Sequence, residues 1–237
     1  AGVDAIVKLD VPAEWKNESG FDHPEVATGD DKLGNMVQNI LEPVNLNDGD
    51  SIPVSAFVPH VDGTFEQGAS AYEKRGVAVD VPEWNQDKCI QCNQCAYVCP
   101  HATIRPFALS DEELAAAPKN IRTAAMKGKD VGQYHFIQTV SPLDCMGCGV
   151  CAQVCPAPGK ALEMKNQETQ LAEQEVFDYC VAKVGKKDGM MAETTVKGSQ
   201  FNKPLLEFSG SCAGCAETAY ARLVLSLIHL RRCRRRG

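Results

Sequence analysis

The hydrophobic positions near the start of the chain recur with helical spacing. In "LGNMVQNILEPV" the apolar residues from Leu33 to Leu41 stand three or four positions apart or side by side, which predicts a helix that Pro43 ends. After the turn signal "NDGD", the segment "SIPVSAFV" predicts a short edge strand, because Pro53 has no N–H to donate to a neighbour. The first 73 residues contain no cysteine and no metal-type spacing, so this third of the chain does not by itself indicate a function.

From Arg75 onward, extended segments alternate with cysteine-rich loops. "RGVAVDV" predicts a strand, a cysteine run follows, and "ATIRPF" predicts a second extended segment. "YHFIQTV", another cysteine run and "KALEMKN" repeat this order, which indicates an internal duplication of strand, loop, helical turn and strand. An insert at about 108–133 separates the two copies, and its "SDEELAAA" predicts a helix start with Ser110 and Glu113 as a capping box. After Lys160 the sequence predicts a polar connector.

The two cysteine runs have the same spacing. "CIQCNQCAYVCP" (Cys89–Pro100, the first run) and "CMGCGVCAQVCP" (Cys145–Pro156, the second run) both read C-x2-C-x2-C-x3-C-P. Bacterial two-cluster iron–sulfur proteins have this spacing, and the fourth cysteine of each run ligates the other cluster. The predicted ligand sets are Cys89, Cys92, Cys95 and Cys155 for one four-iron cluster, and Cys145, Cys148, Cys151 and Cys99 for the other. Zinc, structural thiols and disulfides are the alternatives, but zinc ribbons usually pair two separate C-x-x-C knuckles.

The residues between the cysteines predict two unequal centres. A short helical turn after the third cysteine carries the fourth thiol toward the other run, so the two centres lie close enough to exchange electrons. Gly147 and Gly149 allow backbone N–H groups to approach the sulfurs of the second run, whereas Gln91, Asn93 and Gln94 make the first loop bulkier and more polar. Because hydrogen bonds to sulfur and solvent exposure set the reduction potential, we expect the two potentials to differ.

Three further residues could be taken for metal ligands, but the cysteine spacing does not support that role. His101 follows the first run, and since each centre already has four thiols, we expect a surface or packing histidine. Cys180 is expected to be a buried lone thiol, and Cys233 stands outside any metal-type spacing.

Composition and charge exclude two classes of partner. The chain has 237 residues with 44% hydrophobic and 23% charged, and its longest apolar stretch is far shorter than the roughly 20 residues of a membrane span. Its start has no basic region followed by an apolar core, so no signal peptide is expected, and we predict a cytoplasmic protein without a membrane partner. The net charge of −7 argues against nucleic acid, and the arginine-rich "RRCRRRG" is expected to be a solvated end.

Three segments together resemble one enzyme family. "EKRGVAVDVPEWNQDKCIQCNQCAYVCPHATIRP", "SPLDCMGCGVCAQVCP" and "VKGSQFNKPLLEFSGSCAGCAETAYARL" are similar to pyruvate:ferredoxin (flavodoxin) oxidoreductase, over about Pro53 to Leu223. The resemblance implies oxidation of pyruvate with coenzyme A to acetyl-CoA and carbon dioxide. Thiamine diphosphate carries the carbon chemistry in that family, and three four-iron clusters pass electrons to ferredoxin or flavodoxin.

The resemblance also implies an α+β fold and a domain layout. Residues 1–73 correspond to the end of a preceding domain and a linker, 74–185 to a bacterial-type two-cluster ferredoxin-like domain with an insert, and 186–237 to a truncated start of the thiamine-binding domain. Cys212 and Cys215 would be two of the four ligands of a third cluster, and Glu217 would lie near thiamine diphosphate. No catalytic residue is assigned to this chain, because the rest of the parent enzyme would supply the active site.

The sequence departs from the family after "ETAYARL". The ending "VLSLIHLRRCRRRG" is unlike the family's continuation and suggests a truncation or a shifted reading frame. Cys212 and Cys215 are therefore half a site, and an empty or zinc-binding C-x-x-C pair is the alternative for them. For the whole chain the alternatives are a stand-alone ferredoxin-type electron carrier and a structural zinc protein.

Overall fold

The computed structural model describes residues 7–8, 10–17 and 32–234. The part before residue 73 is helical, with η2 (Ala13–Asn17), α1 (Lys32–Met36), η3 (Val37–Leu41), α2 (Glu42–Asn45), η4 (Gly49–Ser51), η5 (Val54–His60) and η6 (Ala69–Tyr72). The expected helix over residues 33–41 is confirmed, but it continues through Pro43 to Asn45. Pro43 is the second residue of α2, which follows the π-helical turn η3 without a break in the helical backbone, so its missing N–H falls where the hydrogen bonding changes from π to α spacing.

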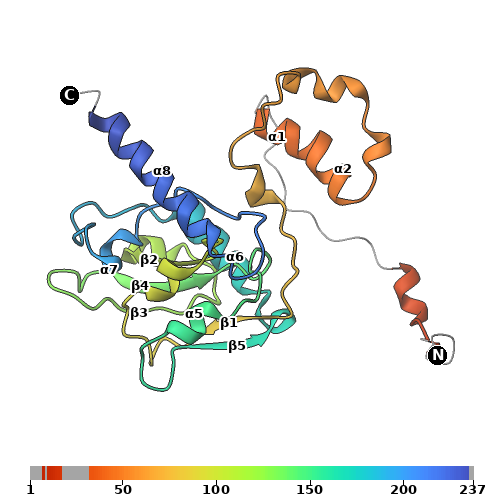
Figure 1. Cartoon of the computed structure of the whole chain (residues 1–237). Helices are drawn as coiled ribbons and strands as arrows, with labels where there is room; N and C mark the ends of the chain where they lie inside the picture. The colour runs from red at the N-terminus through yellow and green to blue at the C-terminus, as the bar shows by residue number, and fades with distance from the viewer. Residues whose placement is uncertain (1–6, 9, 18–31, 235–237) are drawn as a thin grey trace.

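The strand expected around residues 51–58 is wrong. That segment forms the 3-10 helices η4 and η5, and Val54 and Val58 are exposed. A strand there would need a partner, and Pro53 and Pro59 remove two of the N–H groups that a ladder uses. The helical part has a small core of its own, formed by Met36, Val37, Ile40, Leu41 and Ala69, and stands beside the sheet-containing body (Figure 1).

The body contains two antiparallel sheets whose pairing crosses between the two repeats. Strand β1 (Asp80–Trp84) precedes the first run and pairs with β5 (Leu162–Asn166), which follows the second run. Strand β2 (Ile104–Leu109) follows the first run and pairs with β4 (His135–Val140), which precedes the second. The predicted duplication is thus confirmed, and the crossed pairing brings the two runs together.

The strand positions differ from the expected ones at two places. β1 begins at Asp80 rather than near Arg75, because its partner β5 ends opposite Asp80 at Asn166. The two-residue β3 (Ala124–Ala125), which the sequence pattern does not reveal, adds to the edge of β4 and gives the sheet order β2-β4-β3. Both differences depend on partner strands, so local periodicity could not locate them.

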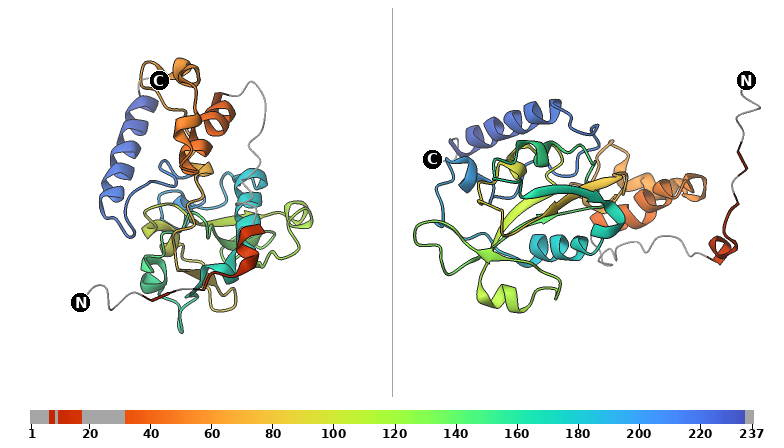
Figure 2. Two further views of the ribbon diagram at one scale, coloured as in Figure 1. Left: turned by 90° about the vertical axis from the view of Figure 1, so that its right-hand side faces the viewer. Right: turned by 90° about the horizontal axis from the view of Figure 1, so that it is seen from below.

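Helices cover both faces of the sheets. Each cysteine run contains a short helix, α3 (Gln94–Val98) or α5 (Val150–Val154), and the two helices contact each other on the face opposite α6 (Glu173–Lys183) (Figure 2). The insert contains α4 (Asp111–Ala115) with the expected capping box at Ser110. The remaining elements are η7 (Gln167–Gln170), α7 (Val196–Ser199) and α8 (Glu217–Arg234), which projects from the body in Figure 1.

The polar connector expected after Lys160 is wrong over residues 173–183. Helix α6 buries Val176, Phe177 and Cys180 against the body, and removing such apolar side chains from water stabilises the fold by roughly 1.5–3 kcal/mol for the large ones. Cys180 is fully buried in this core, so the expectation of a buried lone thiol is confirmed. The chain is an α+β protein, and no helix among its described residues is both long and apolar enough to cross a membrane.

Candidate metal centre

The two cysteine runs fold into the same backbone conformation. Gln91 and Asn93 have φ angles of 58° and 60°, and the equivalent Gly147 and Gly149 have φ angles of 68° and 71°. This left-handed conformation reverses the chain between the cysteines, and α3 and α5 start directly after it. The duplicated sequence therefore produces a duplicated loop, although glycine occupies the left-handed positions in only one copy.

Backbone N–H groups point at three cysteine sulfurs. Gln91 N lies 3.3 Å from Cys89 Sγ, and Gly147 N lies 3.4 Å from Cys145 Sγ. The expected approach of the Gly147 N–H to a sulfur is confirmed, and the first run makes the same contact without a glycine. Ala161 N also donates to Cys155 Sγ at 3.3 Å. Such donors stabilise negative charge on sulfur, which is the state in which cysteine binds a metal.

Four thiols from both runs surround one cavity. Cys89, Cys92 and Cys95 of the first run line it together with Cys155, the fourth cysteine of the second run. The remaining wall is mostly apolar and consists of Trp84, Ile90, Asn93, Gln138, Pro156, Ala157, Ala161 and Leu162. The four thiols are those of the first predicted ligand set.

The other four thiols influence one another electrostatically. Burial raises the pKa of Cys145 to about 11 and that of Cys151 to about 12, and Cys99 from the first run adds to both increases. Cys148, which is exposed, also contributes to both. These are the members of the second predicted set. Burial likewise raises the pKa of Cys95 well above its usual value, and Cys151 adds to that rise, so the two sets are neighbours.

The donor chemistry fits two four-iron clusters. Each set consists of thiols, and the raised pKa values mean that a metal centre must displace protons from the buried sulfurs when it binds. Within the described ranges, no three His, Cys, Asp or Glu side chains converge closely enough to hold a single metal ion. A cubane is ligated at four separate corners and needs a wider arrangement. Which thiol ligates which centre stays a prediction.

Buried polar side chains anchor the first run to distant segments. Gln91 is 1% exposed, and its side chain donates to Ala125 O at 2.8 Å and accepts from Lys127 N at 2.7 Å. Asn93 is 2% exposed and donates to Lys197 O at 2.9 Å. The two residues make the loop polar, as expected, but their polar groups face inward. Sequence reasoning missed the partners because they lie 34 to 104 positions away.

The Cys212–Cys215 loop packs on the second run. Cys215 N donates to Cys212 O at 3.0 Å, and Gly214 between them has a φ of 68°. A Cβ added to Gly214 would lie 3.5 Å from Cys148 Cβ, so this tight turn lies close to the second run. Glu217, the first residue of α8, is exposed, and the side chain of Cys233 lies outside the described residues.

His101 is a packing residue rather than a surface residue. It is 3% exposed, its Nε2 lies 2.8 Å from Ser211 O, and its carbonyl accepts from Phe208 N at 2.9 Å. These bonds fasten the segment before Cys212 to the end of the first run. The expectation of a histidine without a ligand role stays a prediction, but its position between two cysteine loops was not foreseen.

Two cationic side chains pack against the ring of Phe208, in the segment that precedes Cys212. Lys74 Nζ and the Arg105 guanidinium lie 5.4 Å and 5.1 Å from the centroid of Phe208. Lys74 also pairs with Asp144 at 2.7 Å, next to the second run, and Arg105 pairs with Glu207 at 2.7 Å. Residues 73–76 therefore connect the helical part, the second run and the approach to Cys212. The contacts span 70 or more positions for Lys74, beyond the reach of any local pattern.

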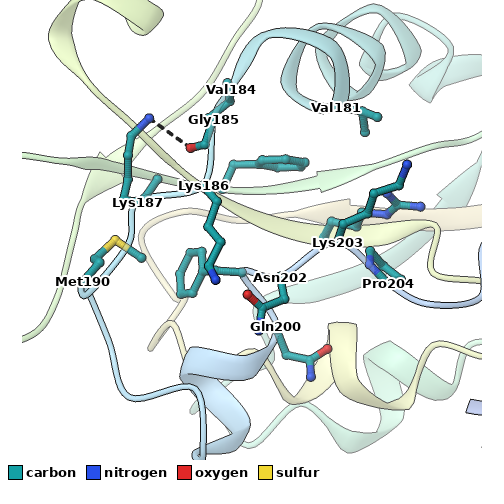
Figure 3. A pocket seen from close by; sticks show the side chains of 14 residues that line it. Val181, Val184, Gly185, Lys186, Lys187, Met190, Gln200, Asn202, Lys203 and Pro204 are labelled. Carbon is teal, nitrogen blue, oxygen red and sulfur yellow. Dashed lines mark hydrogen bonds between the residues drawn. The ribbon is translucent and has the colours of Figure 1, made fainter. Parts of the chain in front are cut away.

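A larger cavity lies away from the cysteines, between α6, β2 and residues 200–204 (Figure 3). It has a volume of about 150 Å³, and four cationic side chains are among its lining residues. Each cation is already paired: Lys187 with Glu113, Lys186 with Glu193, and both Lys203 and Arg105 with Glu207. Every cation of this cavity is thus in an ion pair, and the cavity is a seam between the body and the segment after residue 185.

Comparison with known families gives two matches along the chain. A family described as a 4Fe-4S dicluster domain matches residues 88–158, which contain both runs. A family described as "EKR: Domain of unknown function" matches residues 22–78 and includes Glu73, Lys74 and Arg75. The first match agrees with the ferredoxin-like geometry of the body.

Curated relatives match almost the whole chain. Pyruvate-flavodoxin oxidoreductase of Enterobacter agglomerans is 49% identical over 228 residues, 96% of this chain, and the protein of that name from Klebsiella pneumoniae is 46% identical over 95%. Pyruvate:ferredoxin oxidoreductase of Moorella thermoacetica is 44% identical, also over 95%. In all three the match covers 19% of the relative, so the chain spans about a fifth of their length. The chain belongs to the pyruvate:ferredoxin (flavodoxin) oxidoreductase family.

Proposed function

We propose that this chain is the electron-transfer portion of a pyruvate:ferredoxin (flavodoxin) oxidoreductase. It relays electrons released when pyruvate and coenzyme A are converted to acetyl-CoA and carbon dioxide, and delivers them to ferredoxin or flavodoxin. The observation that carries this proposal is the crossed pairing of β1 with β5 and β2 with β4, together with the cavity that Cys155 of the second run lines beside three thiols of the first. Two metal centres built in this way share one core, so electrons can pass between them.

In this proposal eight thiols ligate two four-iron clusters. Cys89, Cys92, Cys95 and Cys155 hold the first centre, and Cys145, Cys148, Cys151 and Cys99 hold the second. The cavity lined by the first four thiols and the electrostatic coupling among the last four support this assignment. The clusters supply one-electron redox chemistry when bound. The protein contributes the thiols, the N–H donors from Gln91, Gly147 and Ala161, and apolar walls that exclude water.

The remaining parts of the proposal concern the parent enzyme. Cys212 and Cys215 provide half of a third cluster site, and Glu217 lies near thiamine diphosphate, with the other ligands and the substrate site coming from the rest of the parent. The closeness of Gly214 to Cys148 supports this third centre as the neighbour of the second. Residues 74–185 form the ferredoxin-like domain with its insert, while 1–73 and 186–237 belong to the flanking domains.

Anaerobic reconstitution of the chain with iron and sulfide tests the proposal. We expect about eight irons per chain and an electron paramagnetic resonance spectrum of two interacting four-iron centres after reduction. Bound zinc without visible absorption would establish a structural zinc protein instead. A single centre, or none, would refute the electron-transfer role.

A chimera distinguishes the parent enzyme from a stand-alone carrier. This chain would replace the matching segment of the Klebsiella pneumoniae relative, and pyruvate-dependent reduction of flavodoxin would be measured. We expect turnover, and the same chimera with Cys99→Ala serves as the control without a complete relay. If the chain is instead a stand-alone carrier, residues 74–185 should fold and take up their clusters normally without the rest of the chain. The bonds of His101 to Ser211 and of Arg105 to Glu207 argue that the segment after 185 is an integral part of the fold.

A further inference from the structure

Two buried N–H donors in the wall of the first cavity have no hydrogen-bond partner among the described residues. They are the indole Nε1 of Trp84 and the amide Nε2 of Gln138, and the two side chains are 5% and 3% exposed. Both residues line the cavity that Cys89, Cys92, Cys95 and Cys155 surround. A third buried polar atom without a partner among the described residues of this wall, Asn93 Oδ1, is an acceptor and cannot donate to sulfur.

Buried N–H groups almost always have a partner, because leaving one unsatisfied forfeits its interaction with water without replacement. An indole nitrogen can only donate, so its partner must be an acceptor. Trp84 and Gln138 come from β1 and β4, two strands that the sheets hold rigidly, and Trp84 is further fixed by edge-on contact with Phe136 at 5.9 Å. The donors are therefore already in place before anything binds in the cavity.

We infer that Trp84 and Gln138 donate hydrogen bonds to sulfur atoms of the cluster in this cavity and raise its reduction potential. The inference rests on the proposed function, since it takes the first centre as given. A donor facing sulfur stabilises the reduced cluster more than the oxidised one, because the reduced cluster carries one more negative charge. The two residues are positioning groups for electron transfer, not ligands.

The second centre is surrounded differently. Besides the thiols of its own set, Cys99 interacts electrostatically with the guanidiniums of Arg105 and Arg222, and Arg105 is ion-paired with Glu207. Trp84 and Gln138 line the first cavity, so substitutions at these two residues should change the reduction potential of the first centre only. The potential of the second centre then serves as an internal reference.

The test is a redox titration of the reconstituted full chain, followed by electron paramagnetic resonance. Gln138→Met removes one donor with little change of volume, Trp84→Phe removes the other together with one ring of the indole, and Gln133→Met, at an exposed glutamine just before β4, is the matched control for Gln138→Met. The signals are assigned with Cys99→Ala, which is expected to retain the first centre only. We expect the double variant to disfavour reduction of the first centre about tenfold, which is 59 mV for a one-electron couple, with the second centre and the control unchanged.

An unchanged first potential, or equal shifts in both centres, would overturn the inference. If a variant fails to take up the cluster, the wild-type chain with ¹⁵N-labelled tryptophan provides an independent measurement. Hyperfine coupling between the reduced first centre and the indole nitrogen of Trp84 is expected, and its absence refutes the hydrogen bond. A wild-type chain without two centres would instead refute the proposed function, so the two failures are distinguishable.

Discussion

The first and second runs reach the same loop geometry with different residues. The second run has Gly147 and Gly149 at its two left-handed positions, where glycine is unstrained. The first run has Gln91 and Asn93 there, and their side chains bond to the insert and to Lys197. In the first run, these side-chain hydrogen bonds offset the free-energy cost of a positive φ at residues other than glycine. The second run avoids this cost because it has glycine at both positions. The comparison shows that a duplicated metal loop requires the conformation and not a particular residue.

The cationic surroundings of the two predicted ligand sets also differ. Lys127 donates to Cys89 O at 2.8 Å from an exposed position, and Lys197 bonds to Lys127 O. Near Cys99 the cations are Arg105, which is 6% exposed and ion-paired, and Arg222, which donates to Tyr97 O at 3.4 Å. Hydrogen-bonded lysines therefore lie beside Cys89 of the first predicted ligand set, whereas guanidiniums held within the fold lie near Cys99 of the second set.

The largest effect is expected from removing the fourth cysteine of either run, which is predicted to ligate the centre of the other run. Cys99→Ala should abolish the centre of the second run and leave the first intact, and Cys155→Ala should do the reverse, because each of these thiols completes the set of the other run. Iron content should fall to about half in each case. Each variant is the control for the other in electron paramagnetic resonance. Loss of the centre within the mutated run would contradict the crossed assignment.

The next prediction concerns the different losses of stability expected when Gly147 and Gly149 are replaced. Gly147→Ala forces a Cβ to 3.0 Å from Asp80 O at a positive φ, so we expect a loss of about 2–3 kcal/mol in the free energy of unfolding. A Cβ at Gly149 meets nothing within 4 Å, and Gly149→Ala should cost about 1 kcal/mol from the backbone conformation alone. Urea unfolding of the chain measures both. Gly149→Asn, which copies the first run, should be the mildest change, and equal losses for all three would contradict the argument.

Removing an anchor of the first run should have a smaller and local effect. Gln91→Ala deletes the two hydrogen bonds to residues 125–127, and we expect a loss of about 1–2 kcal/mol with faster amide exchange at β3. Hydrogen exchange followed by mass spectrometry locates the change. Gln94→Ala, at an exposed residue of the same run, is the control, and it should leave β3 unaltered. Uniform exchange changes across the body would rule out a local anchor.

The smallest effect concerns the buried thiol that neither run uses. Burial raises the pKa of Cys180 from 9.0 to about 12, so the folded chain should not react with maleimide at this site at neutral pH, whereas the unfolded chain should. Below pH 9 the thiol is protonated in both states and stability is unaffected. Between about pH 9 and pH 12 only the unfolded chain loses this proton, so its contribution to stability falls as pH rises.

Mapping the modified peptide by mass spectrometry, with Cys180→Ala as the control for pH-dependent unfolding, tests this prediction. In the Cys180→Ala control, the free energy of unfolding should decrease less steeply as the pH rises into the alkaline range. Prompt labelling of Cys180 in the folded chain would show that α6 opens readily. Unchanged iron content in Cys180→Ala would complete the contrast with the eight cysteines of the runs.

The sequence by itself determined the duplicated runs, the strands on either side of them and the cap at Ser110, because these depend on spacing, periodicity and residue type within about a dozen positions. It missed β3 and α6, and it predicted a strand at residues 51–58 that is helical, because pairing and burial decide such segments. Only the tertiary structure brought Trp84 and Gln138 to the first cavity, His101 to Ser211, and Lys74 to Asp144 and Phe208. These contacts join residues far apart in the chain, and a linear pattern carries no information about which distant residues the folded core makes neighbours.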